Sequence, residues 1–337
     1  MNRIPLARLP TPIERLDRLS EEWGAEVCVK LDDLTGTDLS GNKVRKLEFL
    51  LADARGEGAT TIITCGAVTS NHARAAAIAA RKLYLDCHLV LAGDPPVHPT
   101  GNLQLDLLTG AKVHYITRED YTLRIDSMLE QLAEDLRRKG ERPYVIPTGG
   151  SNAVGLWGYV EAVRETQEQC AALGWQPEFL ACAVGSGGTY AGIALGCLIY
   201  DFKAACLGIL VCGSVEGFSQ KIHGDIAQAI QRRGLDLDYS PDRTRLADEY
   251  IGGGYAQTNT SQMQFIRHVA QEEALILDPV YTGKAFYGVY GEIQKGNIPR
   301  GASVLFFHTG GIFGLPSFDS ILAEEWKNNT YWEDRFR

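Results

Sequence analysis

Lys43 is the side chain whose type and position most favour covalent chemistry. It follows a Ser-Gly-Asn segment at residues 40–42, which favours a turn and a helix cap. The apolar residues after it recur at the spacing of one helical face: Val44, Leu47, Leu50 and Leu51. A partly desolvated lysine at a helix start can lose its proton near neutral pH and form a Schiff base with an aldehyde. Most lysines are simply solvated, so this segment alone leaves both interpretations open.

A glycine-rich loop is the second candidate for chemistry. It lies between a predicted buried strand at 180–184 and a predicted helix at 190–200, and its residues are Gly185, Ser186, Gly187, Gly188 and Thr189. Glycines let several backbone N–H groups converge on one anion, and the helix dipole adds to the attraction. Tyr190 stands where a dinucleotide fingerprint needs a glycine, and the Walker lysine is absent. The pattern favours one phosphate monoester, with a tight turn as the alternative.

Other loops rich in Ser, Asn, Thr and Gly also follow predicted strands, at residues 66–74, 148–152 and 308–311. Ser70 and Asn71 begin an alanine-rich helix, where they could hold a carboxylate or act as an ordinary cap. His72 could be an acid–base group or be satisfied by local hydrogen bonds. For Tyr255 and Tyr281, a place in the substrate pocket and a half-buried core position stay equally open.

Together these parts match what pyridoxal 5'-phosphate needs from a protein. A lysine would hold its aldehyde, a cradle its phosphate, and a hydroxyl or carboxylate its ring nitrogen. Two other classes remain as hypotheses, a non-catalytic carrier or sensor of this cofactor and a nicotinamide-dependent oxidoreductase. Tyr190 weakens the second of these.

Composition narrows the kind of partner. The chain has 337 residues, which favours two domains or one large α/β unit with a subdomain. Its net charge of −9 argues against nucleic acid or an anionic membrane surface as the main partner. Eight cysteines without a C-x-x-C pair predict reduced core thiols in a cytoplasmic chain, with no metal role. No export signal and no membrane span is visible, so we expect a cytoplasmic protein that binds small molecules.

The elements that must position these residues alternate in type. The first predicted set consists of strands at 60–65, 87–92, 112–116 and 144–146 and helices at 71–82, 102–108, 121–139 and 154–172. The second set consists of strands at 180–184, 206–212 and 303–307 and helices at 190–200, 220–232 and 262–273. Before them, Ile13, Leu16 and Leu19 suggest a short helix and residues 27–30 a strand. Alternation with short loops predicts open α/β layers with parallel sheets, whose ligands bind at the carboxyl ends of strands.

The chain resembles the family of D-cysteine desulfhydrases and 1-aminocyclopropane-1-carboxylate deaminases. This family lies within the tryptophan-synthase-β-like class, fold type II, of pyridoxal-phosphate enzymes. The matching motifs span nearly the whole chain, at residues 9–12, 41–48, 70–72, 147–152, 185–189, 278–284 and 308–311. The closest motifs are those of D-cysteine desulfhydrase and L-cysteate sulfo-lyase, which the sequence does not separate well.

The resemblance implies a role for each candidate residue. Lys43 would carry the cofactor, and Asn71 would hydrogen-bond its 3-oxygen. Ser70, Asn71 and His72 would bind the substrate, with Ser70 at its carboxylate. The loop from Gly185 to Thr189 would bind the phosphate, and Thr309 would face the pyridine nitrogen. Tyr255 and Tyr281 would line the substrate side and, with Lys43 and Ser70, form the catalytic set.

The resemblance also implies a homodimer of two-domain chains, and we expect no metal-ligating residue in the site. We expect a large cofactor-binding domain at residues 1–49 plus 161–337 and a small inserted α/β domain at residues 50–160. The expected reaction is α,β-elimination on a small β-substituted amino acid, D-cysteine giving pyruvate, ammonia and hydrogen sulfide. L-cysteate is the second candidate substrate, and ring-opening deamination is less favoured.

Four departures bear on the substrate. Thr69 stands where relatives usually have glutamine, and Tyr190 where they often have histidine or glutamine. Ile312-Phe313 replaces an Ala-Pro pair that is common in bacterial members. Thr282 stands where the deaminases carry a glutamate that faces the pyridine nitrogen, so Thr309 is the expected ring partner here. A neutral hydroxyl holds the ring proton less firmly than a carboxylate, which favours elimination over cyclopropane opening.

Overall fold

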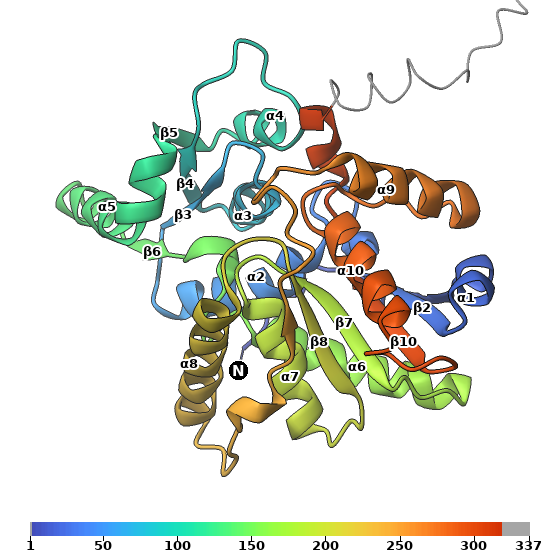
Figure 1. Ribbon diagram of the computed structural model, residues 1–337. Coiled ribbons are helices and arrows are strands. Elements are labelled where there is room, and N and C mark those ends of the chain that lie inside the picture. The colour runs from blue at the N-terminus through green and yellow to red at the C-terminus, as the bar shows by residue number, and fades with distance from the viewer. Residues whose placement is uncertain (1, 319–337) are drawn as a thin grey trace, which may run out of the picture.

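The larger of two sheets has six strands in the order β1-β2-β10-β7-β8-β9, in a computed structural model that describes residues 2–318 (Figure 1). The strands are β1 (Ile13–Arg15), β2 (Glu26–Leu31), β7 (Phe179–Val184), β8 (Ala205–Leu210), β9 (Leu246–Ala247) and β10 (Ser303–His308). β1 is antiparallel to β2, and the other neighbours are parallel. The central strands are buried apolar runs, as expected for parallel strands with helices on both faces.

Helices cover both faces of this sheet. One face packs against α1 (Asp17–Trp23), α9 (Thr260–Glu273) and α10 (Thr282–Gln294), around an aromatic core that contains Trp23, Phe265, Phe286 and Phe306. The other face packs against α2 (Asn42–Gly56), α6 (Trp157–Leu173), α7 (Gly188–Ile199) and α8 (Val215–Arg233). Successive β2 residues alternate between these two cores, since Val27 and Val29 belong to the first and Cys28 to the second.

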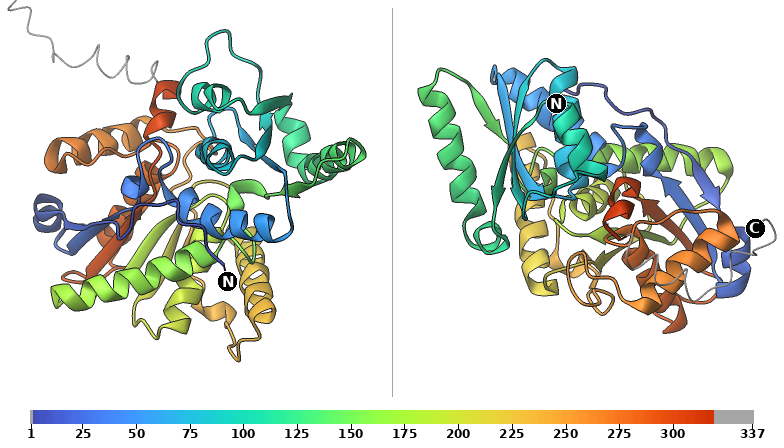
Figure 2. Two further views of the ribbon diagram at one scale, coloured as in Figure 1. Left: turned by 180° about the vertical axis from the view of Figure 1, so that it is seen from behind. Right: turned by 90° about the horizontal axis from the view of Figure 1, so that it is seen from above.

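The smaller sheet has four parallel strands in the order β5-β4-β3-β6. Its strands are β3 (Thr61–Ala67), β4 (Asp86–Ala92), β5 (Lys112–Ile116) and β6 (Pro143–Val145), and its helices are α3 (Asn71–Lys82), α4 (Gly101–Leu108) and α5 (Arg118–Arg138). Figure 2 shows this sheet beside the larger one, with α5 on its outer side. These strands fall within residues 50–160, while the domain boundaries themselves stay a prediction.

Most of the predicted elements are confirmed, and three differ, one of them the short strand β9, which was not predicted. Ile13 lies in β1 and not in a helix, because its backbone pairs with Lys30 of β2. The helix α10 was not predicted, because its sequence holds three glycines and three aromatic residues, which have low helix propensity. Short 3-10 turns complete the fold: η1 (Asp32–Thr35), η2 (Thr148–Gly150), η3 (Pro241–Arg243) and η4 (Ile312–Phe318). The fold is the predicted α/β architecture with two parallel-sheet layers.

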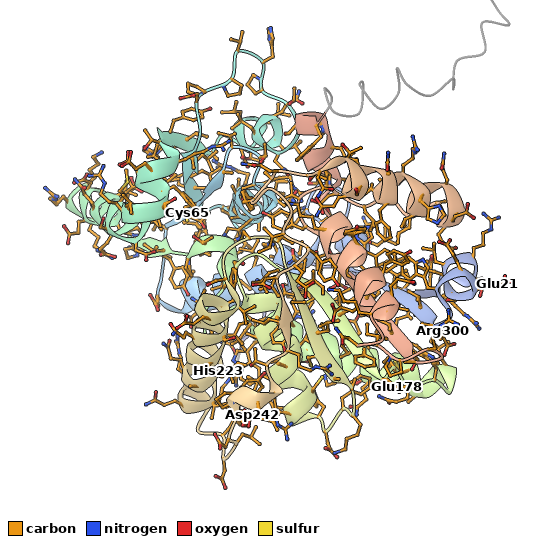
Figure 3. All side chains as sticks on the ribbon, in the orientation of Figure 1. Glu21, Cys65, Glu178, His223, Asp242 and Arg300 are labelled. Carbon is orange, nitrogen blue, oxygen red and sulfur yellow. The ribbon has the colours of Figure 1, made fainter. Side chains whose placement is uncertain are left out.

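The carboxyl ends of strands from both sheets contribute to one cavity of about 800 Å³. Gly66 and Ala67 at the end of β3 and Ala92 at the end of β4 line it from the smaller sheet. Gly185 after β7 and Thr309 after β10 line it from the larger sheet. Cys65 lies where the smaller sheet borders this cavity, whereas Glu21, Glu178, Asp242 and Arg300 lie at the periphery (Figure 3). The geometry therefore follows the rule that ligands bind at strand carboxyl ends.

Candidate active site

The start of α2 is joined to the end of β10 by close backbone contact. The Asn42 N–H donates to the carbonyl oxygen of Thr309 at 3.1 Å. Gly41 has φ 87°, and a Cβ atom there would lie 2.8 Å from the same oxygen. Only glycine fits both the left-handed backbone and this approach. The turn at residue 41 therefore fixes Lys43, in the first turn of α2, against the loop that carries Thr309.

Lys43 extends into the cavity, and its Nζ donates to Oδ1 of Asn42 at 2.9 Å. Burial lowers the pKa of Lys43 to about 8; the Asp278 carboxylate opposes this and the Arg74 guanidinium adds to it. A lysine with this pKa has an appreciable neutral fraction at physiological pH, which nucleophilic attack on an aldehyde requires. The predicted position and character of Lys43 therefore agree with the geometry, while its catalytic role stays a prediction.

The glycine-rich loop forms a cradle at the start of α7. Gly187 has φ 85° and precedes the first helical residue, Gly188. A Cβ atom at Gly188 would lie 2.6 Å from Oγ of Ser151, so this glycine also permits close packing. The Gly188 N–H donates to Ser151 Oγ at 3.2 Å, and Ser186 Oγ lies 2.8 Å from the same atom. The N-terminus of a helix of 12 residues, with hydroxyls and glycines around it, suits an anion.

Asn42 connects the lysine to this cradle. Its Oδ1 accepts from Lys43, and its Nδ2 donates to Oγ1 of Thr189 at 3.0 Å. One planar amide therefore spans the gap between the amine and the helix start that would meet a phosphate. This arrangement places an aldehyde-binding group and a phosphate-binding group within reach of one small cofactor.

Lys46 lies behind the cradle and was absent from the predicted set. Its side chain is buried, and its Nζ donates to the Gly149 carbonyl oxygen at 3.2 Å and to Ser151 Oγ at 3.0 Å. Burial holds the pKa of Lys46 well below its usual range, and the charge of Lys43 adds to the effect. Ser151 contacts both Lys46 and Ser186, so the amine lies one side chain away from the cradle. The available signal was a lysine between apolar positions of one helical face.

Ser70 and Asn71 stand at the start of α3, as predicted. Ser70 Oγ accepts from the Ala73 N–H at 3.1 Å, so its own hydroxyl hydrogen remains for another acceptor. Asn71 lines the cavity, and its Oδ1 accepts from Nδ2 of Asn102, on α4, at 3.0 Å. The cap and the cavity-lining role therefore coexist at this helix start.

His72 lines the cavity as a neutral ring. The Thr64 hydroxyl donates to the Ile146 carbonyl oxygen at 2.8 Å, so the 2.8 Å contact between Thr64 and His72 Nε2 requires the histidine to donate. Nδ1 of His72 then carries a lone pair, and it has no hydrogen-bond partner among residues 2–318. Burial holds the pKa of His72 well below its usual range, helped by Lys43 and Lys46. The ring can accept a hydrogen bond, but it does not offer charge to a carboxylate.

Tyr255 and Tyr281 meet at the cavity wall, where their hydroxyl oxygens lie 2.6 Å apart and their rings are nearly perpendicular. The Tyr281 ring lies 5.8 Å from Nζ of Lys43. Burial raises the pKa of both tyrosines, so both remain protonated near neutral pH. Thr309 lines the cavity as well. These three predicted residues are therefore brought together around Lys43.

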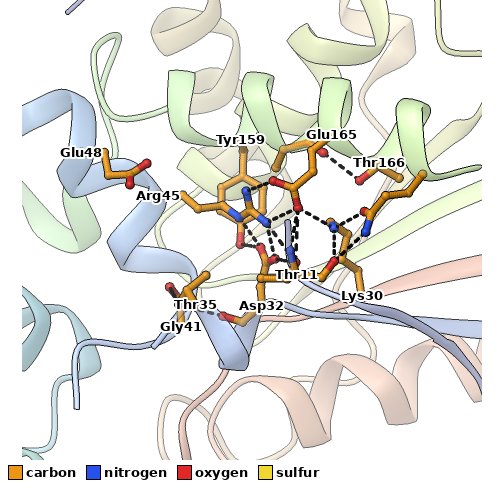
Figure 4. Close-up of polar contacts among 12 residues, drawn as sticks. Thr11, Lys30, Asp32, Thr35, Gly41, Arg45, Glu48, Tyr159, Glu165 and Thr166 are labelled. Atoms are coloured by element: carbon orange, nitrogen blue, oxygen red, sulfur yellow. Dashed lines mark hydrogen bonds and ion pairs between the residues drawn. The ribbon is translucent and has the colours of Figure 1, made fainter. Parts of the chain in front are cut away.

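Behind Lys43, a buried ionic network holds α2 in place (Figure 4). Arg45 donates to Asp32 at 2.7 and 2.9 Å and to Glu165 at 2.9 Å. Lys30 pairs with Glu165 at 2.7 Å, and the Tyr159 hydroxyl donates to Asp32 at 2.6 Å. Burial would raise the pKa of Asp32, but Arg45 overcomes this and holds it below its usual range. The network joins η1, α2 and α6, so it fixes the helix that presents Lys43.

The residues around the cavity fit pyridoxal phosphate on chemical grounds. They supply an amine of lowered pKa, a cradle in which Cβ atoms would collide, and a threonine hydroxyl across the cavity. Asp94 is the single carboxylate among the described lining residues. Within residues 2–318, no group of three His, Cys, Asp or Glu side chains is placed to hold a metal ion. The amine, the cradle and the threonine hydroxyl suit an organic cofactor with one phosphate.

Comparison with known proteins identifies the class. Residues 4–310 match the family model described as pyridoxal-phosphate dependent enzyme, and the chain belongs to this family. It is 41% identical over 322 residues to a protein of Arabidopsis thaliana named bifunctional D-cysteine desulfhydrase/1-aminocyclopropane-1-carboxylate deaminase, mitochondrial. That match covers 92% of this chain and 78% of the relative. It is also 40% identical over 314 residues to the D-cysteine desulfhydrase of Klebsiella pneumoniae, covering 92% and 94% of the two chains.

The fold comparison agrees. A crystal structure described as the ACC deaminase homologue superposes with a TM-score of 0.89 at 40% identity, covering 96% of both chains. These findings make the chain a pyridoxal-phosphate-dependent lyase of fold type II and confirm the predicted family and cofactor.

Proposed function

We propose that this lyase carries out α,β-elimination on a small β-substituted amino acid, with D-cysteine as the leading substrate. The products would be pyruvate, ammonia and hydrogen sulfide. The observation that carries the proposal is the ring-side group. Thr309 lines the cavity, whereas the hydroxyl of Thr282 is buried and donates to Asp278 Oδ1 at 2.7 Å. A neutral hydroxyl on the ring side supports a modest electron sink, which suits a substrate with a good leaving group.

The cofactor would be held by Lys43 through its aldehyde, by the loop from Gly185 to Thr189 through its phosphate, and by Asn71 and Thr309 through its ring. When bound, it supplies an electron sink for charge that develops at the substrate α-carbon. Lys43 Nζ would be the base that accepts the α-proton. Its lowered pKa supports this role, because a free amine is available near neutral pH.

The substrate carboxylate would lie at the start of α3. Ser70 has a hydroxyl hydrogen to donate, because its lone pair already serves the Ala73 N–H. The dipole of α3 attracts the same carboxylate. On the opposite wall, Tyr255 and Tyr281 are both protonated, and because one hydroxyl donates to the other, one hydroxyl hydrogen would remain to donate to the departing β-substituent. His72 would contribute a neutral ring to the same wall of the substrate site.

L-cysteate is the second candidate, and one side chain favours it. Arg118 begins α5, lines the cavity, and makes no ion pair within the described part of the chain. An unpaired guanidinium at a cavity wall attracts an anionic β-substituent such as a sulfonate. The Arabidopsis relative is named for both desulfhydrase and deaminase activities, so similarity alone does not separate thiol elimination from ring opening.

The test is a substrate panel of D-cysteine, L-cysteate, β-chloro-D-alanine and 1-aminocyclopropane-1-carboxylate. We expect the highest kcat/KM among β-substituted alanines for D-cysteine and little product from the cyclopropane, measured as 2-oxoacid release. Preference for L-cysteate that is lost in Arg118→Gln, but kept in Arg124→Gln, would select the second candidate. A cyclopropane kcat/KM equal to or above every β-substituted alanine would overturn the elimination proposal.

The predicted setting of the enzyme belongs to the same proposal. We infer a cytoplasmic homodimer with a small domain at residues 50–160 inserted between residues 1–49 and 161–337. The eight free cysteines support a reducing compartment. Within residues 2–318, no helix combines the length and apolarity needed to cross a bilayer. Exposed apolar side chains such as Val97, Leu108 and Leu123 are candidates for subunit contact, and sedimentation of the purified protein would measure the oligomeric state.

A further inference from the structure

We propose that Asn102 is a positioning residue that orients the Asn71 amide with its NH2 group toward the cofactor. The inference deepens the proposed function, because it rests on Asn71 as the contact for the cofactor's 3-oxygen. Asn102 lies on α4, outside every motif that the sequence singled out, and its side chain is only 1% exposed.

The orientation of the Asn102 amide is set by a backbone carbonyl. One terminal atom of the side chain lies 2.8 Å from the carbonyl oxygen of Thr69 and 3.0 Å from Oδ1 of Asn71. A carbonyl oxygen can only accept, so the atom facing it must be the NH2 nitrogen of Asn102. The same nitrogen then donates to Asn71, which makes the facing atom of Asn71 its carbonyl oxygen. These two hydrogen bonds therefore fix the orientation of both amides.

The Asn71 amide therefore presents a hydrogen-bond donor to the cavity. Because Oδ1 of Asn71 is engaged by Asn102, Nδ2 is the polar end of Asn71 that remains for a ligand. The 3-oxygen of a pyridoxal ring carries negative charge when ionised and needs a donor. With the amide reversed, the oxygen of Asn71 would face that charge and repel it. Asn102 therefore selects the orientation that can bind.

The other end of Asn102 argues against a purely structural role. Its Oδ1 is buried and has no hydrogen-bond partner among residues 2–318. A buried acceptor without a partner destabilises a fold, so an apolar residue of similar size would serve simple packing better. The asparagine is thus best explained by the two hydrogen bonds that its NH2 group donates.

Close packing fixes the start of α4 and, with it, the position of Asn102 beside Asn71. Gly101 has φ 56°, and a Cβ atom there would lie 2.2 Å from the Phe313 carbonyl oxygen. Only glycine permits this approach, which packs η4 against the first turn of α4. The segment at residues 312–313, one of the sequence departures, therefore touches the helix that carries Asn102.

The test compares Asn102→Leu and Asn102→Asp with Asn71→Ala, using purified protein from which the cofactor is removed and then titrated back. Leucine removes the donor at similar size, and aspartate places acceptors against two oxygens. We expect each Asn102 variant to lower cofactor affinity about tenfold, which is roughly 1.4 kcal/mol. We also expect the midpoint of the pH-dependent visible absorption to shift by about one pH unit. Asn297→Leu is the control, because Asn297 also donates through Nδ2, to Glu292 at 2.9 Å, outside the cavity lining.

A double-variant cycle separates the positioning role of Asn102 from the cofactor contact of Asn71. If Asn102 acts through Asn71, Asn102→Leu in the Asn71→Ala background should cause no further loss of affinity and no further spectral shift. Independent, additive effects would overturn the positioning proposal. Unchanged affinity and spectrum in Asn71→Ala alone would instead refute the role of Asn71 and leave the lyase activity untouched. If the leucine variant does not fold, the aspartate variant decides the same outcomes.

Discussion

The lowered pKa of Lys43 can be measured without turnover, by acylating the protein stripped of cofactor across a range of pH. At pH 7 an amine with a pKa of about 8 is ~9% neutral, against ~0.04% for an ordinary lysine of pKa ~10.4. The neutral fraction differs by roughly 200-fold. The sign follows from the cause, because burial disfavours the charged ammonium form and so lowers the pKa.

The expected result is a labelling rate of Lys43 that rises with pH and reaches half its plateau near pH 8. Peptide mass spectrometry would give the rate for each lysine, with the exposed Lys82 as an internal reference for reagent decay. Added cofactor should protect Lys43 and leave Lys82 unchanged. Borohydride reduction of the holoprotein should place the pyridoxyl adduct on Lys43, and an adduct on Lys46 or Lys284 would reject the assignment.

A variant tests whether burial is the cause. Tyr281→Ala removes a ring that lies 5.8 Å from Nζ of Lys43 and should admit water, which raises the midpoint toward that of an ordinary lysine. Tyr84→Ala is the control, because Tyr84 is 94% exposed and outside the cavity lining. A midpoint above pH ~10 in the parent protein, or an unchanged midpoint in Tyr281→Ala, would refute the reasoning.

Three further outcomes are expected. Lys46→Met should lower cofactor affinity by tenfold or more in equilibrium titration while borohydride still labels Lys43, and an unchanged affinity would remove Lys46 from the phosphate site. Arg45→Met should lower the free energy of unfolding by about 3–5 kcal/mol in urea, because Asp32 loses its buried cation; a loss below ~1 kcal/mol would contradict this account of the network. Burial lowers the pKa of His88 to about 4, so between pH 6.5 and 4 the unfolded state binds a proton that the folded state does not, and the free energy of unfolding falls as pH falls. His88→Phe should flatten this dependence of the free energy of unfolding on pH, measured in urea titrations. An equally steep dependence in the variant would reject His88 as its source.

The strand-end loops could be predicted because the residues that identify them are neighbours in the sequence. A buried strand, a glycine or hydroxyl cluster and an alanine-rich helix follow one another in the sequence around Ser70 and around Gly187. The carboxyl ends of parallel strands lie at one edge of a sheet, so the two clusters were expected to face a common ligand. The shared cavity agrees with that expectation.

The supporting residues could not be predicted, because their meaning depends on distant contacts. Arg45 looked like an ordinary helix residue, yet Glu165 lies 120 positions away in the chain and holds its guanidinium. Asn102 is 31 positions from Asn71, and only the packing of α4 on α3 brings the two amides together. Lys46 has a weak signal in its apolar surroundings, but Ser151 must fold back before its place beneath the cradle is visible.

At Thr282, the residue type could be read from the sequence, but the contact that it makes could not. Its type was the basis for expecting a neutral group at the pyridine nitrogen. The contact it makes explains why that position is closed to the cavity: the Asp278 carboxylate accepts from the N–H groups of Val280, Tyr281 and Thr282 and from the Thr282 hydroxyl. This cap fixes the start of α10 and thereby Tyr281, which faces Lys43. In the proposed site, Thr282 would therefore leave the ring side to Thr309, while the cap orients Tyr281 on the side proposed for the substrate. A carboxylate at residue 282 would meet the Asp278 charge, so this cap opposes a carboxylate ring partner at that position, which supports the proposed elimination.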